Sequence, residues 1–96
     1  MMEFHHRALD ELRQAQLWYR TKSVQSAERF FGQVSRALDR VLADPASQPA
    51  IGRGFHYVRV RKFPFILVYR IRSEGNVFIV AVAHTSRRPG YWNRRK

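Results

Sequence analysis

The spacing of apolar residues changes at a Pro- and Gly-rich segment, residues 45–54, and this change constrains the fold more than any other feature. Before the segment, apolar residues recur every three or four positions, which is the period of an amphipathic helix. After it, apolar and polar residues alternate or form short β-branched runs, which is typical of strands. The sequence therefore predicts a helical half followed by a strand half, an α+β fold.

Two antiparallel helices are expected within residues 7–44. In the first helix, one apolar stripe consists of Ala8, Leu12, Ala15 and Tyr19, and Leu17 projects to the opposite side. Ser23 suits the N-cap of the second helix, and Pro45 ends that helix at Asp44. The linker 20–22 is short enough to require a helical hairpin. The second helix has a wide apolar face made of Val24, Ala27, Phe30, Phe31, Val34, Ala37, Leu38, Val41 and Leu42.

Three antiparallel strands are expected within residues 55–84, the last two joined by a hairpin turn at 73–76. If Ser73 opposes Asn76, the pairs run without interruption from Arg72–Val77 to Phe65–His84. The face predicted to meet the helices then holds Phe65, Leu67, Tyr69, Ile71, Phe78, Val80 and Val82, in line with Val58 and Val60. The opposite face holds Ile66, Val68, Val77, Ile79, Ala81 and Ala83 with Arg70 and Arg72.

Residues 2–5 complete the predicted order β-α-α-β-β-β as a short edge strand. The expected architecture is a helical hairpin packed on one face of a small antiparallel sheet, as a single domain over residues 1–96. A loop at 45–54 joins the two halves, and a basic tail at 85–96 follows the last strand.

Basic residues are concentrated in the strand half. Residues 51–96 carry 11 of the 18 Lys and Arg residues, but only Glu74 of the seven acidic residues. Arg makes up 15 of those 18, and its planar guanidinium binds phosphate or carboxylate in a two-pronged way. This distribution favours an anionic partner, either nucleic acid or an acidic protein.

Several chemical classes are disfavoured. The chain has no Cys, its carboxylates lie mostly on the helices, and His5 and His6 would point to opposite faces of a strand, so neither a metal nor another cofactor is expected. No apolar run is long enough to cross a membrane, and the polar start is unlike a signal peptide, so we expect no membrane association and a cytoplasmic location.

One set of residues could carry chemistry. His84 ends the last strand, Arg87 and Tyr91 follow it, and Arg59 on the neighbouring strand could meet them if the tail folds back. Such a set could cleave RNA without a metal, by activating the ribose hydroxyl and stabilising the charge on phosphorus.

Two stretches of the strand half form a specific pattern. They are Val60-x-Lys62-Phe63-Pro64-Phe65-x-x-Val68-Tyr69 and Ala81-Val82-Ala83-His84-x-x-Arg87-x-Pro89-x-Tyr91-Trp92. Together with residues 8–12, Trp18-Tyr19, Ala27-x-x-Phe30 and the Pro45–Pro49 loop, this pattern resembles the RelE/ParE family of toxins from type II toxin–antitoxin systems, a plasmid-stabilisation type.

The resemblance implies a bacterial growth inhibitor with the predicted fold, which a cognate antitoxin neutralises in a hetero-oligomer. An extended antitoxin segment would wrap the helices and the sheet, with Leu17, Arg70 and Arg72 as contacts. RelE-like members of the family cleave mRNA in the ribosome, whereas ParE-like members poison DNA gyrase.

Departures from the RelE pattern favour the ParE-like branch. The slot of a catalytic Arg at the start of the third strand holds Ile66, one lysine slot holds Tyr57 while Arg59 fills the other, and Thr85 stands where an Arg ends the last strand. Target-binding residues would then be Arg59, Arg61, Arg70, Arg87, Arg88, Tyr91 and Trp92. Two alternatives stay open: a RelE-like, ribosome-dependent endoribonuclease using His84, Arg87, Tyr91 and Arg59, and a non-toxic RNA-binding module.

Overall fold

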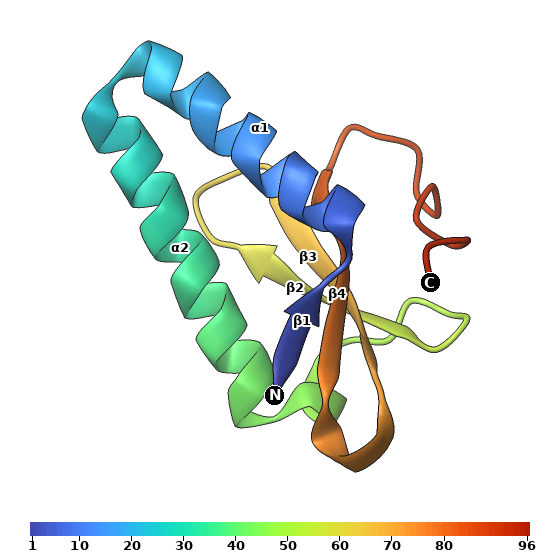
Figure 1. The fold of residues 1–96 in the computed structure, drawn as a ribbon. Helices are drawn as coiled ribbons and strands as arrows, with labels where there is room; N and C mark the ends of the chain where they lie inside the picture. Colours follow the sequence, from blue (N-terminus) through green and yellow to red (C-terminus); the bar gives the residue numbers. More distant parts are fainter.

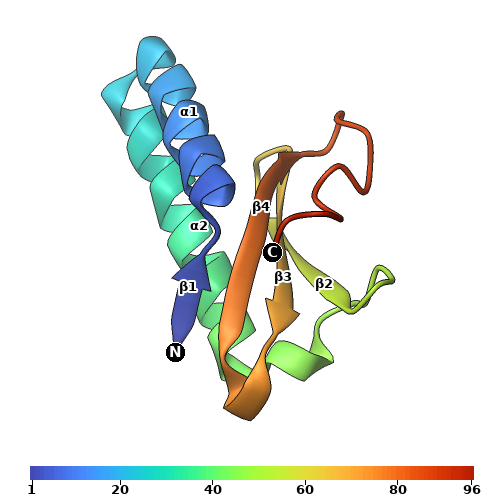
Figure 2. The same ribbon diagram turned by 45° about the vertical axis from the view of Figure 1, so that its right-hand side comes forward.

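The helices and strands follow the predicted order in the computed structural model, which describes the backbone of residues 1–96 and every side chain except that of Glu74. The elements are β1 (Met2–Phe4), α1 (His6–Lys22), α2 (Val24–Ala43), β2 (Phe55–Val60), β3 (Phe65–Ile71) and β4 (Val77–His84). Short 3-10 turns lie at Pro45–Ser47 and Ser73–Gly75. The helical hairpin covers one face of the sheet, and the C-terminal tail lies on the other side (Figures 1 and 2).

A single residue, Ser23, separates the two helices. Its backbone is extended, its amide donates to the Tyr19 carbonyl at 3.1 Å, and its hydroxyl accepts from the Ser26 amide at 2.9 Å. Ser23 therefore ends α1 and caps α2, as predicted. Residues 20–22, expected as a linker, form instead the last turn of α1, because one extended residue is enough to reverse the chain.

The larger core lies between the hairpin and the sheet. Its buried residues are Ala8, Ala15, Phe30, Val34, Ala37 and Val41 from the helices and Val58, Val60, Leu67, Tyr69, Val77, Ile79 and Val82 from the sheet. The apolar face of α2 is wider than this core. Val24, Phe31 and Leu42 stay about half exposed, because the sheet covers only one side of the helix.

The sheet is mixed, with strand order β1-β4-β3-β2. β2, β3 and β4 are antiparallel as predicted, whereas β1 pairs parallel to β4, with Met2 beside Val77 and Phe4 beside Ile79. The edge strand could not be oriented from its own residues, because three residues can pair in either direction. Its direction is set by α1, which starts directly after it.

A bulge in β4 corrects the predicted register. Phe65 pairs with His84 and Val68 with Ala81, as expected, but Tyr69 pairs with Ile79, so Val80 is an extra residue. Beyond the bulge every β4 side chain changes face. Val77 and Ile79 therefore join the core under the helices, while Phe78 and Val80 move to the opposite face.

That opposite face carries a second, smaller core. Its buried residues are Phe55, Val68, Phe78, Val80, Ala81, Ala83 and Trp92. Trp92 belongs to the tail and is only 6% exposed. The basic tail expected at 85–96 is thus folded back over the sheet, because this face is too apolar to be left to solvent.

The start of α1 is held by His5, which is buried. Its Nδ1 accepts from the Arg7 amide at 3.1 Å, and its ring lies 4.4 Å from that of His6. Burial, with smaller electrostatic effects of the neighbouring His6, Arg95 and Arg7, lowers the pKa of His5 below its usual 6.5. His5 is therefore a neutral helix cap, and not the strand residue that the sequence suggested.

We expect the stability of the fold to decrease below about pH 6.5, because the unfolded chain then binds a proton at His5 more readily than the folded chain does. The contribution is fully present above this pH and is lost as pH falls. Urea unfolding measured between about pH 8 and pH 5 checks this. The variant His5→Asn keeps a capping oxygen without a titrating group and should lose less stability on acidification; identical pH profiles would contradict the prediction.

Candidate functional site

The carboxylate of Glu11 on α1 is the centre of a polar site beside β4. β1 ends at Phe4, and beyond it the edge of β4 has no neighbouring strand. Glu11 Oε1 accepts from the Val82 amide at 3.0 Å, which satisfies a backbone donor of this free edge. A helix side chain therefore takes the place that a longer β1 would have filled.

Arg95 binds the same carboxylate from the tail. Its Nη1 and Nη2 donate to the two oxygens of Glu11 at 2.9 and 3.0 Å, and Nη1 also donates to the Val80 carbonyl at 2.9 Å. The side chains of Glu11 and Arg95 are 13% and 11% exposed. This two-pronged ion pair is nearly buried, so it fixes the end of the tail against the sheet.

Tyr91 and Arg87 complete the cluster. The Tyr91 hydroxyl donates to Glu11 Oε2 at 2.8 Å, and Arg87 Nη1 lies 3.2 Å from the same oxygen. The Arg87 guanidinium also stacks on the Tyr91 ring, 3.7 Å from its centre. Burial and the hydrogen bond to Glu11 raise the pKa of Tyr91 well above its usual value of 10, so its phenol stays protonated at neutral pH.

His84 lies next to this cluster on the helix side of the sheet. Its ring packs edge to face on Phe65, and its Nδ1 accepts from the Ser86 amide at 3.1 Å. Glu11, His84 and Arg87 line one shallow depression of about 220 Å³. Of the four nuclease candidates, the structure therefore brings together His84, Arg87 and Tyr91.

Arg59, the fourth nuclease candidate, lies on the other face of the sheet. Strand alternation puts its exposed side chain on the side of Tyr57, opposite Val58 and Val60. With Arg61 it lines a separate hollow of about 340 Å³ at the β2–β3 turn, which also includes Thr85. The expected meeting of Arg59 with His84 does not occur, because paired strands keep the two side chains on opposite faces.

Arg70 and Arg72 lie at the far end of the same face as Arg59. The Arg70 guanidinium sits about equally far from the Phe55 and Phe78 rings, at 5.7 and 5.8 Å, and that of Arg72 lies 3.7 Å from Phe78. Leu17, the other expected antitoxin contact, is 64% exposed on the hairpin. It lines a groove between α1 and α2 together with Val24.

Glu11 and Arg95 are the functional-site residues that sequence reasoning missed. The contacts join residues 84 positions apart, and no local pattern indicates such a pair. The one available signal is that Glu11 lies beside the apolar stripe of α1, where a charge needs a partner.

Two features, a metal site and a membrane-spanning helix, are absent from the part of the chain that the structure describes. No three His, Cys, Asp or Glu side chains gather there in a way that could hold a metal ion. Nor does any described helix combine the length and the apolar character needed to span a bilayer.

We expect Glu11→Gln to lower the free energy of unfolding by about 3 kcal/mol, because it leaves the charge of Arg95 nearly buried without its partner. It should also loosen the tail. In a Trp18→Phe background, Trp92 is the remaining tryptophan, and acrylamide quenching of its fluorescence should increase. Glu28→Gln, at an exposed carboxylate on α2, is the matched control and should leave both measurements unchanged. Equal effects of the two substitutions would show that the cluster does not hold the tail.

Comparison with known families gives one match over nearly the whole chain. The family model described as "ParE toxin of type II toxin-antitoxin system, parDE" matches residues 2–89. No curated protein sequence gives a significant match. The matched range includes the hairpin, all four strands, Glu11 and Arg87, and it agrees with the order of helices and strands described above. The chain therefore belongs to the family of ParE toxins of type II toxin–antitoxin systems.

Proposed function

We propose that this ParE-family toxin inhibits bacterial growth by binding and poisoning DNA gyrase, and that a cognate antitoxin neutralises it in a hetero-oligomer. The family supports the toxin role and implies an antitoxin partner. The choice of gyrase over the ribosome rests on the arrangement of the candidate residues.

The observation that carries this choice is the separation of the nuclease candidates. Cleavage of RNA without a metal needs a base, an acid and a cation around one phosphate. His84 and Arg87 line one hollow and Arg59 lines another, and the two hollows share only Phe65 among their lining residues. Strand alternation directs the His84 and Arg59 side chains to opposite faces of the sheet. This separation disfavours contact of all of them with one phosphate.

The state of Tyr91 also favours binding over catalysis. A general acid works best when its pKa is near the working pH. Burial and Glu11 raise the pKa of Tyr91, and its hydroxyl already donates its hydrogen bond to the Glu11 carboxylate. Tyr91 therefore serves as a rigid support for Arg87, whose side chain is 53% exposed and can contact a partner.

The target surface in this proposal is the basic end of the sheet. Arg59 and Arg61 project from the β2–β3 region, and Arg87 and Arg88 from the start of the tail. The guanidinium group of Arg70 adds a further positive charge along the same face as Arg59. Trp92 holds the tail against the sheet, because its side chain is buried in the second core.

The antitoxin surface in this proposal has two parts. Leu17 and Val24 offer an apolar groove on the hairpin, and Arg70 and Arg72 offer cations beside the Phe78 ring. The groove and the Arg pair lie on opposite sides of the sheet. An extended antitoxin segment with apolar and acidic residues could contact both by wrapping around the molecule.

Purified protein is expected to block supercoiling by gyrase and to accumulate gyrase–DNA cleavage complexes. The double substitution Arg61→Ala/Arg88→Ala should weaken inhibition about tenfold or more, because exposed Arg side chains are frequent binding hot spots. Arg7→Ala, which removes an exposed charge from α1, is the control and should change inhibition less than about twofold. Plasmid supercoiling assays measure both.

Two results would overturn the gyrase proposal. One is an absence of gyrase inhibition at a stoichiometric excess of the protein. The other is the appearance of codon-phased cuts in translated mRNA without a DNA-damage response, which would identify a RelE-like endoribonuclease.

Leu17→Asp should abolish neutralisation by the cognate antitoxin while leaving toxicity intact. The expected loss of affinity is about 100-fold, because an apolar contact is removed and a charge is buried in its place. Binding of labelled antitoxin and growth on co-expression measure this. Leu42→Asp is the matched control, because Leu42 lies near the C-terminal end of α2, at the other end of the helical hairpin from Leu17. Unchanged antitoxin binding by the Leu17 variant would exclude the groove as a contact.

A further inference from the structure

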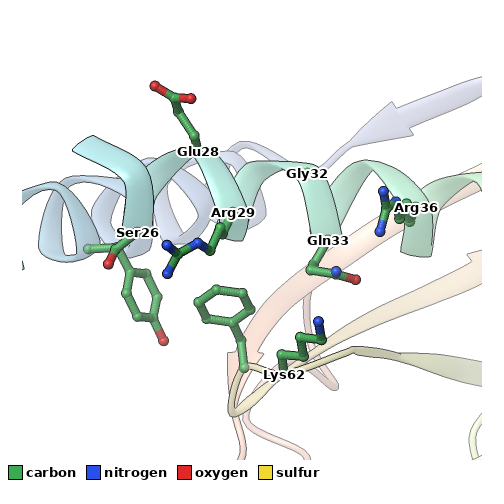
Figure 3. A pocket seen from close by; sticks show the side chains of 9 residues that line it. Ser26, Glu28, Arg29, Gly32, Gln33, Arg36 and Lys62 are labelled. Carbon is green, nitrogen blue, oxygen red and sulfur yellow. The ribbon is translucent and has the colours of Figure 1, made fainter. Parts of the chain in front are cut away.

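A cleft of about 610 Å³ lies between α2 and the β2–β3 turn, away from the Glu11 cluster (Figure 3). Arg29, Gln33 and Arg36 line it from α2, and Lys62 and Phe63 line it from the turn, with Tyr19 behind them. Lys62 and Phe63 also line the hollow of Arg59 and Arg61, whereas Arg29, Gln33 and Arg36 belong to neither the proposed gyrase surface nor the proposed antitoxin surface. The cleft therefore adjoins the proposed gyrase surface at the turn, and the chemistry of its α2 side needs its own explanation.

The cleft is electropositive. Arg29, Gln33 and Arg36 are four and three residues apart, so they share one side of α2. Lys62 faces them from the turn, where its backbone is left-handed with φ of 71°. Figure 3 shows its ammonium directed toward Gln33; Glu28 also lines the cleft, but its carboxylate points to the side of α2 that is opposite Lys62. Among the described side chains, the only ion pairs are those of Glu11, so the three cations are free to bind an anion.

An aromatic ring forms the floor of the cleft. Phe63 packs edge to face on Tyr19 at 4.9 Å and on Phe30 at 5.3 Å between ring centres. These neighbours hold the ring in one orientation, and Phe63 itself is only partly buried. A ring that is fixed in this way offers a surface on which another flat group can stack.

Gly32 opens the wall of the cleft on the helix side. Glycine inside a helix costs about 1 kcal/mol relative to alanine. A Cβ at Gly32 would meet no atom within 4 Å, so close packing inside the molecule does not explain this glycine. Gly32 leaves the backbone of α2 without a covering side chain between Arg29 and Arg36.

We propose that this cleft binds single-stranded nucleic acid, with phosphates on Arg29, Arg36 and Lys62 and a base stacked on Phe63. Arg29 and Arg36 are about 10 Å apart along the helix axis at a rise of about 1.5 Å per residue, which suits successive phosphates of a strand better than one phosphate. The aromatic floor favours an oligonucleotide over an acidic peptide, because every base has a face that stacks.

Anisotropy of a labelled single-stranded oligothymidine tests the phosphate contacts. Arg29→Ala/Arg36→Ala should weaken binding at least tenfold, because each lost phosphate contact reduces the electrostatic part of the affinity. It should also lower the slope of log affinity against log salt by about 1.4, from about 0.7 for each lost contact with a single strand. Arg7→Ala/Arg20→Ala removes the same charge from exposed positions of α1 and should weaken binding less than about threefold.

A second variant tests the stacking. Phe63→Leu keeps an apolar side chain in the floor and should weaken binding about five- to tenfold, with an unchanged salt slope. An oligonucleotide that carries a fluorescent purine analogue should be quenched by the wild type and less by this variant. Circular dichroism checks that the variant is folded; if it is not, the Arg pairs alone decide the outcome.

Equal losses for the two Arg pairs would overturn the proposal, since they would show that only the overall positive charge attracts the strand. Polyglutamate that binds the wild type but not Arg29→Ala/Arg36→Ala, while oligothymidine binding is the same in both, would identify an acidic peptide as the ligand instead. The proposal is independent of gyrase, so Arg29→Ala/Arg36→Ala should still inhibit supercoiling. The two hypotheses can thus fail separately.

Discussion

The carboxylate of Glu11 holds together the parts of the molecule that secondary structure alone does not join. β4 continues beyond the end of β1, which leaves the Val82 amide and the Val80 carbonyl at a free edge. Glu11 satisfies the first, and Arg95, bound to Glu11, satisfies the second. Unpaired backbone groups at a buried edge are costly, so this pair stabilises the strand. The same pair anchors the tail, and Trp92 then closes the second core.

The bulge at Val80 decides which residues are available on each face. One extra residue reverses the alternation of β4, so Val77 and Ile79 pack under the helices and Phe78 turns to the other side. On that side, the Phe78 ring lies beside the guanidinium groups of Arg70 and Arg72. Without the bulge, these two cations would lie beside smaller aliphatic residues. The aromatic and basic character of this face thus depends on a local irregularity in one strand.

The proposed activities occupy largely different surfaces of one small fold, and Arg70 is shared by the gyrase and antitoxin surfaces. Gyrase binding is assigned to Arg side chains at the end of the sheet, antitoxin binding to the Leu17 groove and the Arg70–Arg72 pair, and nucleic-acid binding to the cleft beside α2. The positive charge is common to all of them, because 18 basic residues oppose seven acidic ones. Long-range attraction therefore brings any anionic partner to the protein, and the local shape and the aromatic neighbours of each surface select among them.

The sequence by itself determined the helical hairpin, the Ser23 cap and the antiparallel strands, because periodicity, capping and turn chemistry act within a few residues. It also placed Leu17 on the surface and carried the resemblance to the toxin family that the family match confirmed. Only the tertiary structure decided that β1 runs parallel to β4, that Arg59 and His84 lie on opposite faces, and that Glu11 binds the tail. Each of these depends on contacts between residues far apart in the chain, and such contacts leave no period in the local sequence.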